Sequence, residues 1–180
     1  MTIYDDLREQ YAQWTQEDLD YWRSSGRFAE HFATGFKEYI GAPEHYRDPA
    51  TGDRLPYVQL CALEDDHSAP GGTRFRPTKF HDALTAGDDG YLTFGVSAIL
   101  ERAQNAFPKT SFNFSIGMLP RAAGWCRMRI AGESLEIDMA DDQARAPAYD
   151  HMLKTLQRWL ASRPWDEQKN PIGFLHHPIE

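Results

Sequence analysis

Regular alternation of apolar and polar residues in the middle of the chain constrains the fold more than any other feature. Apolar side chains occupy every second position of residues 92–100 and again of residues 112–118. Successive side chains of a β-strand point to opposite faces, so this period of two predicts strands with one apolar and one polar face. Such strands are typical of antiparallel sheets that are covered on one side only.

A tight hairpin is expected near Gly132. Residues 131–134 suit a two-residue type II′ loop with Gly132 at its first central position. One-residue slippage would move every side chain to the wrong face, so the apolar pattern specifies which residues share a face. The expected cross-strand pairs are Ile130 with Leu135, Met128 with Ile137, Cys126 with Met139, Arg129 with Glu136, and Arg127 with Asp138.

The first 41 residues are predicted to be helical. Apolar residues recur at helical spacing, and Thr2 lies three residues before Asp5, as an N-cap does. A second cap signal at Thr15 and the sequence of residues 24–26 predict breaks, and hence three short helices. Each has an aromatic stripe, which we expect to lie on an apolar surface. The stripe residues are Tyr4, Leu7, Tyr11, Trp14, Leu19, Trp22, Phe28, Phe32, Phe36 and Tyr39.

The whole chain (1–180) is expected to form a single α+β domain. The helical N-terminal part (1–41) precedes a loop and an antiparallel meandering sheet of about five strands within residues 57–139. A helix over 146–162 and an extended tail over 163–180 follow. Because each main strand has one apolar face, we expect the N-terminal helices and the C-terminal helix to pack on one face of the sheet.

Composition narrows the classes of partner. The chain has 19 basic and 27 acidic residues and a formal net charge of −8, which disfavours long nucleic acids and anionic membranes. The sequence predicts no signal peptide and no membrane span, and its two isolated cysteines fit a reducing cytoplasm. Residues 74–129 nevertheless carry eight basic and four acidic side chains, so a small anion or acidic peptide remains compatible. The oligomeric state stays open.

The polar face of the predicted sheet is the first candidate site. Thr93, Ser97 and Asn113 are small hydrogen-bonding residues on this face, and Gly95 between them allows a ligand or another backbone to approach closely. They could form the floor of a ligand cleft. The alternative is an ordinary solvated sheet face.

A basic segment from Gly71 to His81 is the second candidate. Arg74 and Arg76 share a face if the segment is extended, and together with Lys79 and His81 they could hold a phosphate or carboxylate. The segment does not match a P-loop. The alternative is that these cations pair with nearby acids, which are Glu64, Asp65, Asp66 and Asp82.

Metal and thiol chemistry find less support. The acids of residues 64–66 do not have the spacing of a calcium loop, and no cysteine–histidine cluster suits zinc. No metal and no cofactor are therefore expected. Cys126 falls on the predicted apolar face, whereas Cys61 falls on the opposite face, where we expect more exposure.

These observations favour a non-catalytic binding or regulatory module that recognises a small anionic ligand or an acidic partner peptide. One alternative is a small enzyme acting on an anionic substrate, with His81 as the acid/base because its ordinary pKa lies near neutral pH. The other is a protein-interaction subunit that docks through its aromatic N-terminal helices.

Overall fold

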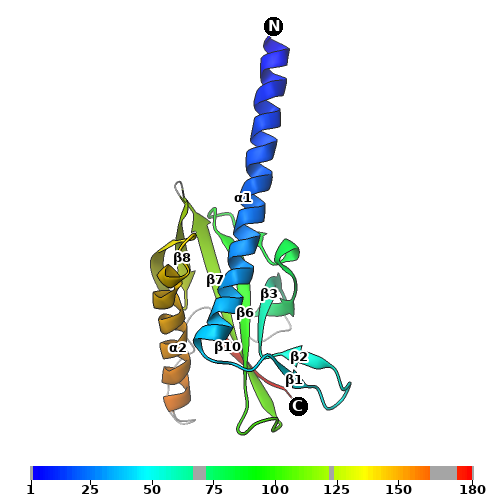
Figure 1. Ribbon diagram of the computed structural model, residues 1–180, viewed down its shortest axis with the longest axis vertical. Helices are drawn as coiled ribbons and strands as arrows, with labels where there is room; N and C mark the ends of the chain where they lie inside the picture. Colours follow the sequence, from blue (N-terminus) through cyan, green and yellow to red (C-terminus); the bar gives the residue numbers. More distant parts are fainter. Residues whose placement is uncertain (1, 67–71, 122–123, 163–173, 180) are drawn as a thin grey trace.

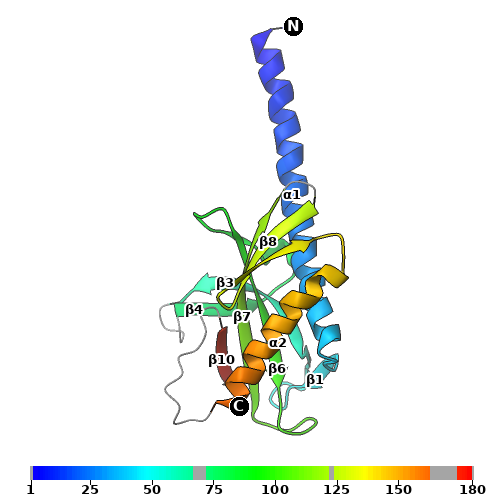
Figure 2. The same cartoon turned by 90° about the vertical axis from the view of Figure 1, so that its left-hand side faces the viewer.

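Two helices cover one face of a twisted antiparallel sheet, and the protein belongs to the α+β class (Figure 1 and Figure 2). The computed structural model describes residues 2–66, 72–121, 124–162 and 174–179, without the side chains of His81 and of 174–179. The helices are α1 (Ile3–Tyr39) and α2 (Ala146–Ala161), with short 3₁₀ turns η2 (Phe80–Asp82) and η4 (Gln143–Arg145). The strands are β1 (His45–Arg47), β2 (Arg54–Pro56), β3 (Val58–Asp65), β4 (Thr73–Pro77), β5 (Thr85–Ala86), β6 (Leu92–Leu100), β7 (Lys109–Pro120), β8 (Trp125–Ile130), β9 (Glu133–Asp138) and β10 (Phe174–Ile179).

The main sheet has eight strands in the order β4-β3-β6-β7-β8-β9, with β5 paired to β6 and β10 paired to β7. The prediction of about five strands was too low. It omitted β5, which has only two residues, and β10, which comes from the tail and returns to pair with β7. It also assigned residues 41–56 to a loop, although β1 and β2 form a separate two-stranded ribbon there.

Helix α1 is one continuous helix of 37 residues, so the prediction of three helices was wrong. Thr2 caps its start as expected, because its hydroxyl accepts a hydrogen bond from the Asp5 amide and the Asp5 carboxylate accepts one from the Thr2 amide. Gly26 does not break the helix. A Cβ at this position would lie 3.0 Å from the Phe80 ring and 3.1 Å from the Phe80 carbonyl oxygen, so the glycine allows close packing against η2.

The β8–β9 hairpin forms with a different register from the predicted one. Its turn is Ala131-Gly132, and both residues have positive φ (46° and 88°), as a type I′ turn requires. The turn centre is therefore displaced by one residue, which shifts every pairing by two. Cys126, Met128 and Ile130 still face the core as predicted, but the observed pairs are Ile130 with Glu133, Met128 with Leu135, Cys126 with Ile137, Arg129 with Ser134 and Arg127 with Glu136.

The shift changes the ion pairs on the polar face. The Arg127 side chain donates to Glu136 over 2.6 Å, whereas the Arg129 guanidinium reaches Asp89 over 2.8 Å. The predicted pairs of Arg129 with Glu136 and Arg127 with Asp138 are thus replaced. Arg129 also lies over the Tyr91 ring, 3.5 Å from its centroid.

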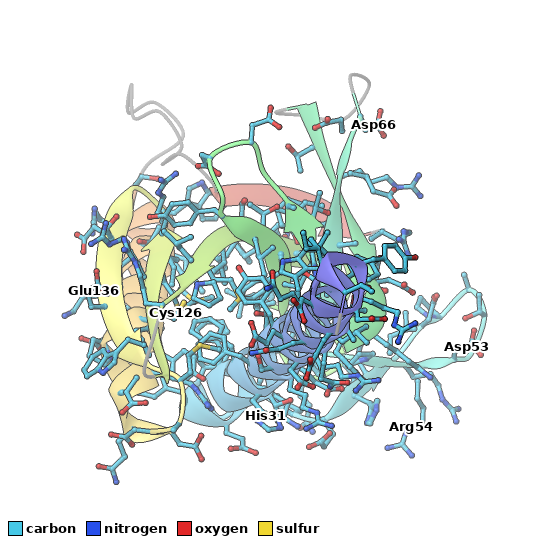
Figure 3. The ribbon with its side chains drawn as sticks, turned by 90° about the horizontal axis from the view of Figure 1, so that it is seen from above. His31, Asp53, Arg54, Asp66, Cys126 and Glu136 are labelled. Atoms are coloured by element: carbon cyan, nitrogen blue, oxygen red, sulfur yellow. The ribbon has the colours of Figure 1, made fainter. Side chains whose placement is uncertain are left out.

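The core lies between the sheet and the two helices. Phe32 of α1 makes edge contact with Phe94 of β6, and Phe36 does so with Phe114 of β7. Tyr149 of α2 completes the cluster, with its ring centroid 4.9 Å from that of Phe32. Seen along α1, the strands form an arc beside the helix; Cys126 lies toward the interior of the molecule and Glu136 at its edge (Figure 3).

Candidate functional site: a projecting helical arm and a pocket on the sheet

The basic segment from Gly71 to His81 does not form a single cluster of cations. Arg76 of β4 is bound by Glu64 of β3, with 2.5 Å between Nε and Oε1, and this hydrogen bond raises the pKa of Arg76. The alternative of local pairing therefore holds for Arg76. Arg74 lies opposite Glu64 in the strand register and is exposed, and it has no ion pair with any residue that the structure describes.

The polar sheet face contains a pocket of about 250 Å³. Ser97 and Asn113 are cross-strand partners in its floor, and Gln59 of β3 extends the same row on the other side of Ser97. Arg74 and Phe75 of β4 line the pocket as well. Three of the predicted site residues thus converge on one small cavity, with amide and hydroxyl groups in its floor and a guanidinium at its side.

The other predicted site residues lie elsewhere. Lys79 lines a separate hollow between α1 and β3. Thr93 lines a third one beside Tyr91, and its hydroxyl donates to the Thr85 carbonyl oxygen over 3.2 Å. The His81 side chain lies outside the described residues, so the histidine on which the enzyme alternative depends has no described environment.

Both cysteines are buried, and the expected exposure of Cys61 was wrong. Cys61 is 1% exposed although it lies on the polar side of β3, because β4 and β6 flank it and the Phe75 side chain lies close above Gly95, its partner on β6. Burial raises the pKa of each thiol to about 12. Neither thiol is therefore poised as a nucleophile.

The first half of α1 projects beyond the sheet as an arm, which we define as residues 3–22 (Figure 1). The arm extends for roughly 30 Å at the rise of an α-helix. Seven of its large apolar side chains are exposed to solvent, among them Tyr4 (71%), Tyr11 (67%) and Trp14 (59%). The others are Ile3, Leu7, Leu19 and Trp22.

The exposed stripe of the arm continues the buried stripe of the same helix. Positions 4, 7, 11 and 14 repeat at spacings of three and four residues, and the same series passes through Ser25, Phe28 and Phe32, which are buried against the sheet. One apolar face thus runs along α1, and the body of the protein covers only its second half. Tyr21, at the base of the arm, is partly buried against the core, whereas the large apolar side chains of residues 3–19 are exposed.

Charge distinguishes the arm from an ordinary apolar helix. Residues 2–24 contain six acidic and two basic side chains, Arg8 and Arg23. Asp18 lies within the apolar stripe, and Glu17 lies on its flank. The arm therefore presents an apolar surface with carboxylates within it and along its flank.

Sequence reasoning identified the aromatic stripe but expected this protein's own sheet to cover it. The arm could be predicted only if α1 was known to be continuous, because a straight helix of this length extends past the end of the strands. The spacing of Tyr4, Leu7, Tyr11 and Trp14 did indicate an apolar helix face at the N-terminus.

Comparisons with known proteins add no assignment: no protein family, no curated protein and no solved structure matches this chain. Among the described residues, no three metal-ligating side chains are grouped to hold an ion. No helix in the described part of the chain is both long and apolar enough to cross a bilayer.

Proposed function

We propose that this protein is an interaction subunit whose arm docks against a basic amphipathic helix of another protein. The supporting observation is the apolar stripe, which is buried along the second half of α1 and exposed along the arm. Most helical stability in proteins comes from packing of an apolar face, and amphipathic helices dock through apolar anchors at spacings of three and four residues. Covering the stripe would stabilise the arm and bury its aromatic anchors.

The charges argue for a basic partner rather than a second copy of this chain. Two copies would bring net charges of −4 against each other over the same residues 2–24. Antiparallel pairing of whole arms sets Asp18 opposite Leu7 of the second copy, and parallel pairing sets the two Asp18 carboxylates together. Burial of an unpaired carboxylate is costly in either case. A partner with Lys or Arg beside its apolar stripe would instead pair with Asp18 and Glu17.

Synthetic helices test this proposal by calorimetry. One peptide of about 20 residues carries Leu at the heptad a and d positions and Lys at e and g, and a second carries Glu in place of Lys. We expect the basic peptide to bind at least about tenfold more tightly than the acidic one, with an affinity that falls as salt rises. Equal binding of the two peptides would contradict the proposal.

Two pairs of variants locate the contact. Tyr11→Gln with Trp14→Gln removes the centre of the stripe and should abolish binding of the basic peptide. Ala12→Gln with Gln16→Ala alters the side of the arm away from Asp18 and Glu17 and should leave it unchanged. Light scattering of the protein alone tests whether a second copy occupies the arm. A dimer that dissociates in the Tyr11/Trp14 variant would identify a second copy as the occupant and contradict the proposal of a basic partner. Binding of the arm to phosphatidylcholine vesicles would overturn it in favour of lipid.

The two free, buried thiols agree with a cytoplasmic location for this subunit, where cysteines stay reduced. A cytoplasmic partner helix is therefore part of the proposal.

A second candidate function is recognition of a small anionic ligand by the sheet pocket. The observation that favours it is the convergence of Arg74, Ser97 and Asn113 on one cavity. Thermal melting with millimolar phosphate or succinate is the test, with Arg74→Ala as the variant. Arg76→Ala is its matched control, because Arg76 is bound to Glu64 and does not line the pocket. A stabilising shift that survives Arg74→Ala, or no shift in the unmodified protein, would exclude this site.

A further inference from the structure

A cleft of about 510 Å³ lies between α1 and the start of α2, on the body of the protein. His31, Thr34, Glu38 and Tyr39 line its α1 wall, and Asp142, Arg145 and Tyr149 line the other (His31 is labelled in Figure 3). The Glu38 carboxylate therefore lies on the same cleft and opposes an anion there. Clefts of this size accommodate small organic molecules. Neither function proposed above uses this cleft.

Arg145 is a buried cation whose counter-ion lies in solvent. The residue is 6% exposed, and its guanidinium donates from Nη2 to the Met139 carbonyl oxygen over 3.1 Å. Nη1 pairs with the Asp142 carboxylate at 2.7 Å, although the Asp142 side chain is 86% exposed. Nε has no hydrogen-bond partner among the described residues. Because a solvated carboxylate gains little from one ion pair, another anion can take its place.

Tyr149 brings a second unsatisfied polar group to the same cleft. It is 4% exposed, and its hydroxyl has no hydrogen-bond partner within the described part of the chain. A Cβ on Gly35 would lie 2.4 Å from this oxygen, so the glycine makes room for the hydroxyl beside α1. Burial raises the pKa of Tyr149 to about 12 against the opposing effect of Arg145, so the hydroxyl remains a donor.

The start of α2 forms the second wall of the cleft and places Arg145 there, beside the carboxylate of Asp142. Ala146 and the preceding residues line the cleft, Pro147 lies in the first turn, and no side chain caps the helix. The Gln143 amide donates to the Asp141 carboxylate, and the Ala144, Arg145 and Ala146 amides donate to the carbonyl oxygens of residues 141, 142 and 143, so side chains and not the backbone would hold an anion here. Buried polar groups are normally satisfied, and Arg145 and Tyr149 lie close enough together for the guanidinium to lower the pKa of the phenol, so one ligand oxygen could accept hydrogen bonds from both side chains.

We propose that this cleft binds a small oxyanion, either a carboxylate or a phosphate monoester, attached to a flat apolar body. The anion displaces Asp142 from the Arg145 guanidinium and accepts a hydrogen bond from Tyr149. The apolar body lies against the ring of Tyr39, which is exposed at the rim and whose centroid is 5.5 Å from that of Tyr149. Asp142 then acts as a competitor that occupies the anion position when the ligand is absent.

Titration with benzoate and with phenyl phosphate, followed by calorimetry and by amide chemical shifts, tests the proposal and separates the two anions. Benzamide is the neutral analogue and should not bind. Asp142→Asn removes the competing carboxylate and should tighten binding several-fold. Asp53→Asn removes the same charge from the turn between β1 and β2, which contributes no residue to this cleft, and should leave the affinity unchanged. Equal effects of the two substitutions would mean that only overall charge matters, which would overturn the proposal.

Tyr149→Phe distinguishes a ligand contact from a structural role. The lost hydroxyl has no partner, so the free protein should melt at the same or a higher temperature while binding of the better anion weakens several-fold. Tyr46→Phe on β1, which lines no part of this cleft, is the matched control and should leave anion binding unchanged. A lower melting temperature of Tyr149→Phe with unchanged binding would overturn the proposal, as would the absence of binding by both anions at millimolar concentration.

Discussion

Lys109 and Glu101 form an ion pair in which the lysine side chain is fully buried. The ammonium group lies 5.1, 5.4 and 4.7 Å from the ring centroids of Tyr46, Tyr57 and Phe107. The Tyr57 hydroxyl donates to the Glu101 carboxylate over 2.7 Å. Because Tyr46 belongs to β1, this cluster fastens the β1–β2 ribbon to the end of β7.

Glu101→Gln should destabilise the protein by about 3 kcal/mol, since removal of one partner leaves the buried Lys109 charge uncompensated. Urea unfolding measures the change. Glu44→Gln makes the same substitution in the Lys37–Glu44 pair, in which the carboxylate is exposed, and its effect should be much smaller. Equal losses in the two variants would show that the aromatic surroundings of Lys109 add nothing.

The stabilisation from Glu101 should disappear in acid. Burial opposes ionisation of this carboxyl, but the hydrogen bonds from Lys109 and Tyr57 outweigh it and hold the pKa of Glu101 below its ordinary value of 4.5. A lowered pKa in the folded state stabilises the protein above the unfolded-state pKa, and this contribution is lost as pH falls through the folded-state pKa. The difference in unfolding free energy between the wild type and Glu101→Gln should therefore shrink below pH 4.5. A difference that stays constant into acid would contradict this assignment.

Gly95→Ala should destabilise the sheet by about 1–3 kcal/mol, because the pocket side of β6 has no room for a methyl group. The added Cβ would lie 2.6 Å from the Phe75 ring and 3.0 Å from Leu63. At Gly117 on β7, the nearest atom is 3.2 Å away on Tyr91, so Gly117→Ala should cost less. Denaturant unfolding of both variants ranks them, and the reverse order would show that Phe75 moves aside freely.

Native protein should react slowly with a thiol reagent such as Ellman's reagent at neutral pH. Burial raises the pKa of Cys61 and of Cys126 to about 12, so almost no thiolate is present. Both thiols should react promptly once urea unfolds the chain, which serves as the control. Rapid modification of either thiol in the native state would show that its strand opens locally.

Local patterns were sufficient to predict the α+β class and the face on which many side chains lie. Cys126, Met128 and Ile130 face the core as the alternation predicted, even though the hairpin register is different. The register depended on backbone conformation, because Ala131 adopts a positive φ, which few residues other than glycine do. The neighbouring sequence contains no pattern that predicts this conformation.

The candidate sites show the same division. Ser97 and Asn113 could be assigned to one face from their positions in alternating strands. Whether Arg74 joins them while Arg76 does not depends on the pairing of β3 with β4, which sets Arg76 within reach of Glu64. Arg145 and Tyr149 could not be predicted as site residues from the sequence, because their burial depends on how α1 packs against the start of α2.

The order of residues by itself determined which side chains share a face of a helix or strand, because helix and strand periods are local properties of the backbone. Only the tertiary structure decided what covers each face. Gly26 packs against Phe80 instead of ending a helix, and α1 therefore continues past the edge of the sheet. One apolar stripe is consequently buried along its second half and exposed along the arm, because the strands end before the helix does.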